Sequence, residues 1–300
     1  MSRVEQHPVQ AILLMLAGVF FLSTMDVVIK MLVEHYSSFQ VVFLRCFLSL
    51  PFFAAWILIS GNSRFRTAYP WGHLTRGIVG VIMLFAVGEC FREMQLADAY
   101  TLFFAAPLVI TLLSGPVLGE RAGSFRIFTA VFGFIGVLVV LKPSAGGWIS
   151  YGALMGLVGM LAYSATALML RRMGNLDGTV TIAFWWVAIV GTLAGLLAIP
   201  QWRPVVLEQW PQLLVLAISG AGGQIFLTAA FRRASAAIVA PLDYTHMIWA
   251  VVYGFAFWGY LPGTRIWVGA AIITLSGLLI LFRENRIHLR QKRDPDQPAI

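Results

Sequence analysis

Charged side chains are rare inside the apolar stretches of this sequence, and the few present have types and spacings suited to binding a solute. Asp243 and His246 lie three positions apart, which places both on one face of a helix. A carboxylic acid beside an imidazole changes its protonation state with small changes in surroundings. We therefore expect the two residues to line a cavity, with proton coupling through the pair as a hypothesis. The alternative is a structural hydrogen bond that buries both groups.

A second acid lies in the first apolar stretch. Asp26 shares a helix face with Ser23 and Lys30. An ionised side chain at mid-membrane costs at least about 2.5–3.5 kcal/mol, so it needs a partner or a function. Arg45, in the second stretch, keeps its proton and needs an acidic or carbonyl partner. We predict a structural Asp26–Arg45 ion pair and expect Lys30 to reach the outer surface. The alternatives are an Asp26–Lys30 pair and direct contact of Asp26 or Arg45 with a substrate.

The elements that position these residues are predicted to be membrane-spanning helices. Hydrophobic residues make up 59% of the 300 residues and charged residues 11%, against about 45–50% and 25% in soluble domains. In hydrocarbon every backbone polar group must be bonded internally, which favours helices. We predict an all-α integral membrane protein with ten transmembrane helices, at approximately 11–33, 39–60, 72–92, 98–118, 124–141, 148–170, 180–199, 211–231, 236–258 and 265–283.

The ten predicted helices form two copies of a five-helix unit. Residues 119–141 and 259–281 share a Gly-bounded polar turn, an Arg at the start of an apolar run, and small residues within that run. An odd number of helices per copy inverts the second copy in the membrane, as in many secondary transporters. We predict two inverted repeats at 10–142 and 147–283, followed by a basic cytoplasmic tail at 284–300.

Aligning the repeats brings aromatic residues to the predicted cavity. Phe103 and Phe104 align with Asp243 and Tyr244. Aromatic faces opposite an acid and a hydroxyl suit a planar or cationic organic solute; the alternative is a Phe pair that packs against helices or lipid. The predicted substrate-binding residues are Asp26, Tyr100, Phe104, Tyr163, Asp243, Tyr244, His246 and Trp249.

Two other groups have predicted structural roles. Glu89, Arg92 and Glu93 have the spacing of a local ion-pair cluster at the outer end of the third helix. The glycines of Gly220–Gln224 permit either close approach of another helix or local unwinding, which would let Gln224 reach the cavity.

The distribution of cations predicts the orientation of the chain. The net charge is +8, but most cations lie in short connections between apolar stretches, so we expect no nucleic-acid partner. Fifteen Lys and Arg residues, Arg76 among them, fall on the side of the N-terminus and five on the other. The positive-inside rule then places both termini in the cytoplasm.

No catalytic residue, cofactor or metal site is predicted. A membrane-embedded hydrolase needs clustered metal ligands or a nucleophile with a base, and the five histidines are scattered along the chain. The sequence also lacks a Gly-x-x-x-x-Gly-Lys-Ser/Thr phosphate-binding loop, which disfavours an ATP-driven pump.

Three segments carry a family resemblance: Ala105–Arg121 with its Leu-Gly-Glu-Arg end, the Gly-rich stretch to Lys142-Pro143, and Ala237–Trp249. Through these segments, residues 10–283 resemble the EamA-type members of the drug/metabolite transporter superfamily. Asp26-Val27-Val28, Phe43-Leu44-Arg45 and Ala240-Pro241-Leu242-Asp243-Tyr244 are similar to the branch with bacterial riboflavin importers and S-adenosylmethionine uptake carriers. The resemblance implies ten helices around a central cavity and alternating access in the bacterial inner (plasma) membrane.

The predicted function is secondary active transport of a small organic metabolite, such as riboflavin, S-adenosylmethionine or a similar compound. The alternatives are an exporter of amino acids or toxic compounds and, from another class, a non-transporting membrane sensor or an intramembrane enzyme. The expected partners are the substrate and the lipid bilayer, with a proton as the candidate coupling ion. Two halves in one chain form a complete unit, so a functional monomer is expected, with a dimer as the alternative.

Overall fold

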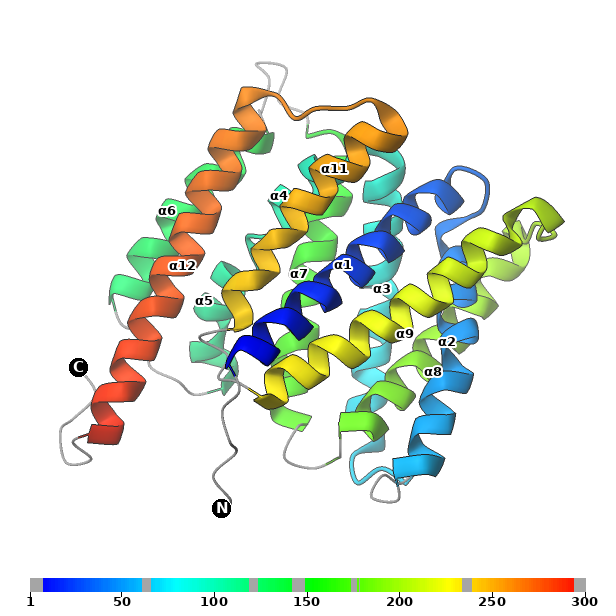
Figure 1. Ribbon diagram of the computed structural model, residues 1–300, viewed down its shortest axis with the longest axis horizontal. Helices are drawn as coiled ribbons and strands as arrows, with labels where there is room; N and C mark the ends of the chain where they lie inside the picture. Colours follow the sequence, from blue (N-terminus) through cyan, green and yellow to red (C-terminus); the bar gives the residue numbers. More distant parts are fainter. Residues whose placement is uncertain are drawn as a thin grey trace.

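The computed structural model describes residues 8–60, 66–118, 124–141, 149–173, 177, 179–233 and 239–293. In these ranges the regular elements are all helical, and they run side by side as one bundle (Figure 1). The start of α1 and the end of α12 lie at the same end of the bundle, which we call the N-terminal end. The opposite end carries the α1–α2 connection, and we call it the loop end.

The helices of the first half of the chain are α1 (Pro8–Val33), α2 (Ser38–Ser60), α3 (Pro70–Glu93), α4 (Leu96–Phe103), α5 (Ala106–Leu118) and α6 (Ser124–Leu141). The second half contains α7 (Tyr151–Met173), α8 (Thr179–Ala198), α9 (Trp210–Arg233), α11 (His246–Trp258) and α12 (Thr264–Arg293). Its 3-10 segments are η1 (Ile199–Gln201), η2 (Leu207–Gln209) and η3 (Ala240–Thr245).

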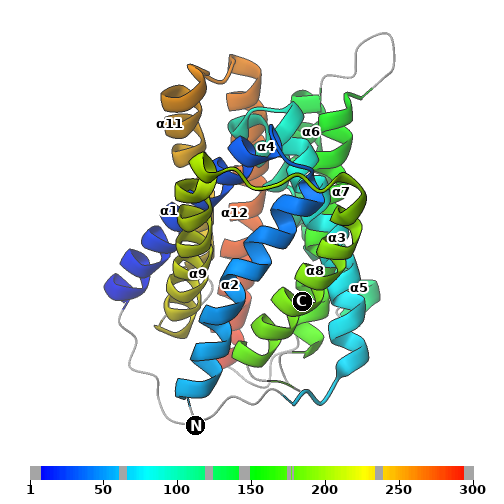
Figure 2. The ribbon, with the colours of Figure 1, turned by 90° about the vertical axis from the view of Figure 1, so that its right-hand side faces the viewer.

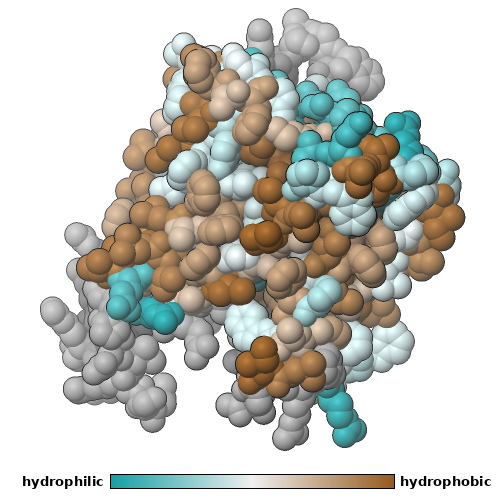
Figure 3. Space-filling model, turned by 45° about the vertical axis from the view of Figure 1, so that its right-hand side comes forward, coloured by the Kyte–Doolittle hydropathy of each residue, from teal (hydrophilic) through white to brown (hydrophobic). Residues whose placement is uncertain are grey.

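The surface and the helix lengths fit a lipid environment. Seven segments of the described chain are long and apolar enough to cross a membrane: Val9–Val33, Ser38–Trp56, Pro70–Glu93, Leu96–Leu113, Tyr151–Leu170, Thr181–Gln201 and Leu207–Leu227. Ile127–Leu141 and Thr264–Ile280 form shorter apolar helices. Hydrophobic side chains cover much of the face in Figure 3, while hydrophilic ones gather toward its ends. The prediction of an all-α membrane protein is confirmed.

The closest packing joins helices from the two halves of the chain. α1 packs along α9, α2 along α8, α3 along α7 and α6 along α12, and α4 contacts α11 (Figures 1 and 2). Glycine permits the close crossing of α1 and α9, because a Cβ on Gly223 would lie 2.7 Å from the Leu22 side chain. α9 is continuous through its glycines, so they serve close approach rather than local unwinding.

The fourth and ninth predicted spans, 98–118 and 236–258, each contain a break in the α-helix. α4 ends at Phe103 and α5 begins at Ala106. Pro107 explains the first break, because it donates no backbone hydrogen bond and its ring clashes with the carbonyl of Phe103. In the ninth span, Pro241 is the second residue of the 3-10 segment Ala240–Thr245, which leads into α11 at His246.

Candidate functional site

A cavity of about 640 Å³ occupies the interior of the bundle, a size suited to a small organic ligand. Residues of both chain halves line it, including the two helix breaks. Among the lining residues are Arg45 and seven of the eight predicted substrate-binding residues: Asp26, Tyr100, Phe104, Tyr163, Asp243, Tyr244 and His246.

The acid of the first helix is held by a tyrosine from the fourth span. Tyr100 lies in α4, shortly before the helix break, and its hydroxyl donates a hydrogen bond to the Asp26 carboxylate. Arg45 lines the same cavity from α2. The direct partner of Asp26 is thus a neutral hydroxyl, and the Asp26–Arg45 ion pair stays a prediction.

Lys30 has a role that the sequence did not predict. Its side chain is buried, and Nζ donates to the backbone oxygens of Phe91 at 2.6 Å and Met94 at 2.9 Å. It also lies over the Trp258 ring at 5.3 Å. The ammonium therefore binds the free carbonyls at the end of α3. The expectation that Lys30 reaches the outer surface is wrong.

His246 joins a cavity-facing acid to a buried hydroxyl. Its Nε2 lies 3.6 Å from Asp243 Oδ1, and its Nδ1 lies 2.7 Å from the hydroxyl oxygen of Ser23 on α1. The imidazole also stacks on the Tyr100 ring, with centroids 5.2 Å apart. His246 is buried, whereas the Asp243 side chain is 53% exposed and lines the cavity. The acid can therefore meet a solute directly while the imidazole holds its position from behind.

Aromatic rings form the cavity wall beside these polar groups. Phe104, at the break after α4, packs edge to face against Tyr244 of η3 with centroids 5.0 Å apart. A Cβ on Gly277 of α12 would lie 1.8 Å from the Tyr244 hydroxyl, so the phenol projects into a space that this glycine leaves open. Tyr244 therefore presents its ring to the cavity, and its hydroxyl lies against α12. Tyr163 lines the cavity from α7.

The structure separates Trp249 from the other predicted site residues. Its indole packs against Phe20 of α1, with centroids 4.9 Å apart, and near Tyr253 at 5.9 Å. It is absent from the described residues that line the cavity. Trp249 therefore supports the contact between α11 and α1.

Arg76 and Trp186 are lining residues that the sequence did not assign to the site. Arg76 of α3 places its guanidinium 4.3 Å from the Trp186 ring of α8, and both line the cavity. A Cβ on Gly80 would lie 2.2 Å from the indole, so this glycine leaves the notch that Trp186 fills. Arg76 falls within the predicted third helix (72–92), and this position was the signal that it is not a loop cation.

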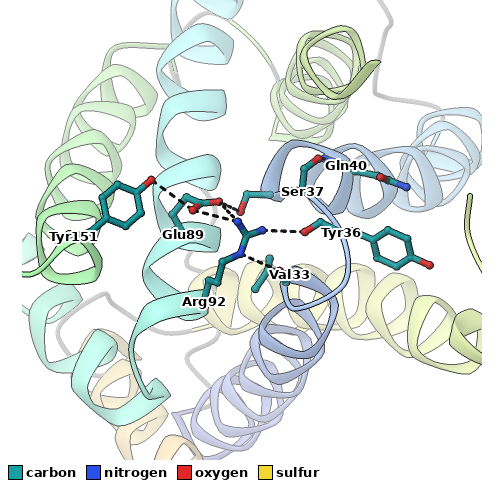
Figure 4. A network of polar contacts seen from close by, with 8 residues as sticks. Val33, Tyr36, Ser37, Gln40, Glu89, Arg92 and Tyr151 are labelled. Atoms are coloured by element: carbon teal, nitrogen blue, oxygen red, sulfur yellow. Dashed lines mark hydrogen bonds and ion pairs between the residues drawn. The ribbon is translucent and has the colours of Figure 1, made fainter. Parts of the chain in front are cut away.

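Polar contacts hold the loop end together (Figure 4). Arg92 of α3 contacts Glu89 at 3.0 Å and donates to two backbone oxygens at the end of α1 and in the α1–α2 connection, each at 2.9 Å. Glu89 also accepts from Ser38 of α2 at 2.5 Å and from Tyr151 of α7 at 3.4 Å. The predicted Glu89–Arg92 pair is confirmed, and it belongs to a network that joins four helices.

A different cluster lies at the N-terminal end. Asp177, in the α7–α8 connection, accepts hydrogen bonds from Thr67 Oγ1 at 2.5 Å and from the backbone N–H of Ala68 at 2.9 Å, and its Oδ2 lies 2.9 Å from His73 Nε2. Burial by itself raises the pKa of the Asp177 carboxyl, but these donors outweigh that effect and lower it below its ordinary value. The cluster ties the α2–α3 connection to the α7–α8 connection.

A helical membrane bundle around an internal cavity that carries both acids and cations has the architecture of a solute carrier. The chain belongs to the EamA-like transporter family, which matches residues 9–142 and again residues 150–282. The family resemblance read from the sequence is therefore confirmed.

Similar proteins have transporter names of several kinds. Identity to a riboflavin transporter of Rhizobium johnstonii is 30% over 290 residues, which cover 96% of this chain and 94% of the relative. A pseudopaline exporter of Pseudomonas aeruginosa is 27% identical, over 88% of this chain and 93% of the relative. An S-adenosylmethionine uptake transporter of Rickettsia conorii is 24% identical, over 88% and 90%.

Proposed function

We propose that this protein is a secondary transporter that moves a small organic metabolite across a bacterial inner membrane by alternating access. The observation that carries the proposal is the cavity of about 640 Å³, where acidic, cationic and aromatic side chains from both chain halves meet. Relatives along nearly the whole chain bear transporter names, which supports transport rather than an enzymatic or sensory role.

The proposed architecture is ten transmembrane helices in two inverted five-helix repeats, at 10–142 and 147–283, with a basic tail at 284–300. The helix pairing supports it: exchanging the halves turns the α1–α9 pair into the α7–α3 pair and leaves the α2–α8 and α6–α12 pairs unchanged. The family also matches each half separately. Since each half lacks its packing partners alone, one chain is a complete unit, and we propose a functional monomer.

We propose an inward-facing state, with both termini in the cytoplasm. Lining residues lie close to the N-terminal end, with Trp56 near the end of α2, Leu170 near the end of α7 and Ile182 near the start of α8. At the loop end, the Arg92–Glu89 network joins α1, α2, α3 and α7. This asymmetry supports access to the cavity from the cytoplasm and a closed outer end of the bundle.

In the proposed site, Asp26, Tyr100, Asp243 and His246 contact the polar groups of the substrate. Asp243 is the candidate proton acceptor, because its carboxylate faces the cavity while His246, joined to Ser23, holds its position. A proton bound at this pair would change the charge that the substrate meets, which couples the two gradients.

The proposed cargo is a metabolite such as riboflavin or S-adenosylmethionine, and uptake is the proposed direction. Export is the second candidate, favoured by the likeness to the pseudopaline exporter. A carrier runs down the gradient to which it is coupled, so the same site serves either direction.

Flux through reconstituted protein tests the proposal. Liposomes containing the purified chain are given labelled riboflavin, S-adenosylmethionine and amino acids, with and without a pH gradient. We expect flux of at least one compound, stimulation by the proton gradient, and loss to background in Asp243→Asn with an unchanged unfolding temperature. Glu208→Gln, which changes an exposed acid in η2, is the control. Normal flux in Asp243→Asn contradicts the site; no flux of any compound by the wild type contradicts the function.

A further inference from the structure

Arg76 is a cation that lines the cavity without the partners that other arginines of this chain have. Its Nε and Nη1 atoms are buried, and no described residue accepts a hydrogen bond from either. Arg92, by contrast, uses Nε, Nη1 and Nη2 on a carboxylate and two backbone oxygens. A buried guanidinium keeps its charge and is costly without an acceptor.

The carboxylates of the cavity do not supply that acceptor. The described lining residues include two acids, Asp26 and Asp243. Asp26 accepts from Tyr100, and Asp243 lies beside His246. Asp26 belongs to α1 and Asp243 to η3, whereas Arg76 lies in the part of α3 nearer the N-terminal end.

The geometry around Arg76 is that of a prepared site. Gly80, one helical turn along α3, leaves the notch for the Trp186 indole, and the guanidinium lies on that ring at 4.3 Å. Stacking fixes the plane of the guanidinium, and its unpaired N–H groups have the geometry that matches a planar or tetrahedral oxyanion. The indole beside it adds a flat apolar surface for the attached group.

We infer that Arg76 and Trp186 form a subsite for an oxyanion of the cargo, a carboxylate or a phosphate. The inference rests on the proposed function, because it names the class of cargo for the same cavity. The acids at Asp26 and Asp243 take a cationic or hydrogen-bond-donating part of the solute, and Arg76 takes the anionic part. The cargo class is therefore an amphoteric organic metabolite that carries one anionic group.

Matched ligand pairs test the subsite in the purified full-length protein. Riboflavin is compared with riboflavin 5′-phosphate, and S-adenosylmethionine with its decarboxylated form, by the ligand-induced rise in unfolding temperature. We expect the anionic member of at least one pair to bind about tenfold more tightly or better. The pair that shows the preference distinguishes phosphate from carboxylate. Arg76→Gln should remove the preference, and Arg76→Lys should restore part of it.

Arg283→Gln is the matched control, because Arg283 also stacks on an aromatic ring, Phe125 at 4.2 Å, but does not line the cavity. It should keep the preference. Equal binding of both members of each pair, or a preference that survives Arg76→Gln, overturns the inference while leaving transport intact.

The unfolding temperature without ligand gives a readout that does not depend on knowing the cargo. A buried guanidinium whose acceptor is a ligand destabilises the ligand-free protein. Arg76→Met should therefore unfold at a temperature equal to or above that of the wild type. A purely structural arginine would give a lower temperature, and that result overturns the inference even if none of the four compounds binds. Absence of flux for all compounds would contradict the proposed function instead, and this temperature comparison would still decide the role of Arg76.

Discussion

The two ends of the bundle are held by polar clusters of different construction. At the loop end, Arg92 and Glu89 join the ends of α1, α2, α3 and α7. At the N-terminal end, Asp177 gathers three donors from the α2–α3 connection and the start of α3, so the cluster mainly joins connections. The cavity extends close to the second end. A network that ties four helices directly to one another closes the space between them, whereas a contact made mainly between connections leaves that space open.

The largest effect is expected from Arg92→Gln at the loop end. The change leaves Glu89, whose side chain is 10% exposed, without its cationic partner and leaves two backbone oxygens without donors. Because hydrogen bonds to charged groups contribute about 1.5–3 kcal/mol, and Arg92 is partly exposed, we expect a loss of about 2–3 kcal/mol in unfolding free energy. Thermal unfolding in detergent measures it, with Arg283→Gln as the control.

Replacing both partners sharpens this prediction. In the double variant Arg92→Gln/Glu89→Gln no unpaired carboxylate is left. Its loss of unfolding free energy should therefore be smaller than the sum of the losses of the two single variants. Strictly additive losses would show that the two side chains act independently, and the loop end would then owe its closure to apolar packing.

A smaller effect is expected from Asp177→Ala at the N-terminal end. Three donors lose their common acceptor, and His73, whose side chain is 1% exposed, loses its Nε2 partner. The other donors lie in a connection where water can replace the carboxylate, so we expect a loss of about 1–2 kcal/mol. Glu208→Ala, at an exposed acid, is the control. A loss larger than that of Arg92→Gln would reverse the order of the two ends.

The sequence predicted the helices and the local ion pair of this comparison better than the contacts between helices. Apolar length located the helices because hydrocarbon requires internally bonded backbone, and Glu89–Arg92 was readable from spacing alone. The partners of Arg92 on α1 and in the α1–α2 connection were not readable, because they depend on tertiary packing. Tertiary packing also decides the position of Lys30, because its partners are backbone carbonyls at the end of α3.

Within the candidate site, the helix breaks decided what the sequence could and could not predict. Treating 236–258 as one helix placed Asp243, His246 and Trp249 on one face. The 3-10 segment of η3 ends at Thr245, and α11 begins at His246, so the spacing of a single helix does not hold across the whole stretch. Trp249 then meets Phe20 of α1. Arg76 was missed because it was counted with the cations of the connections, although α3 begins at Pro70 and places it well inside the helix.

The smallest effect is a difference in acid stability between the two ends. The hydrogen bonds to Asp177 hold its native pKa below the ordinary value of 3.8, against the opposing effect of burial. A carboxyl with a depressed native pKa stabilises the folded state above its unfolded pKa, and this contribution is lost as the pH falls through the native value. The stability difference between wild type and Asp177→Asn should therefore be constant from about pH 5 to pH 8 and should shrink only below about pH 4. Unfolding temperatures of both proteins across this range measure it. A difference that changes between pH 5 and pH 8 would contradict the assignment of this stabilisation to the hydrogen-bonded Asp177 carboxylate.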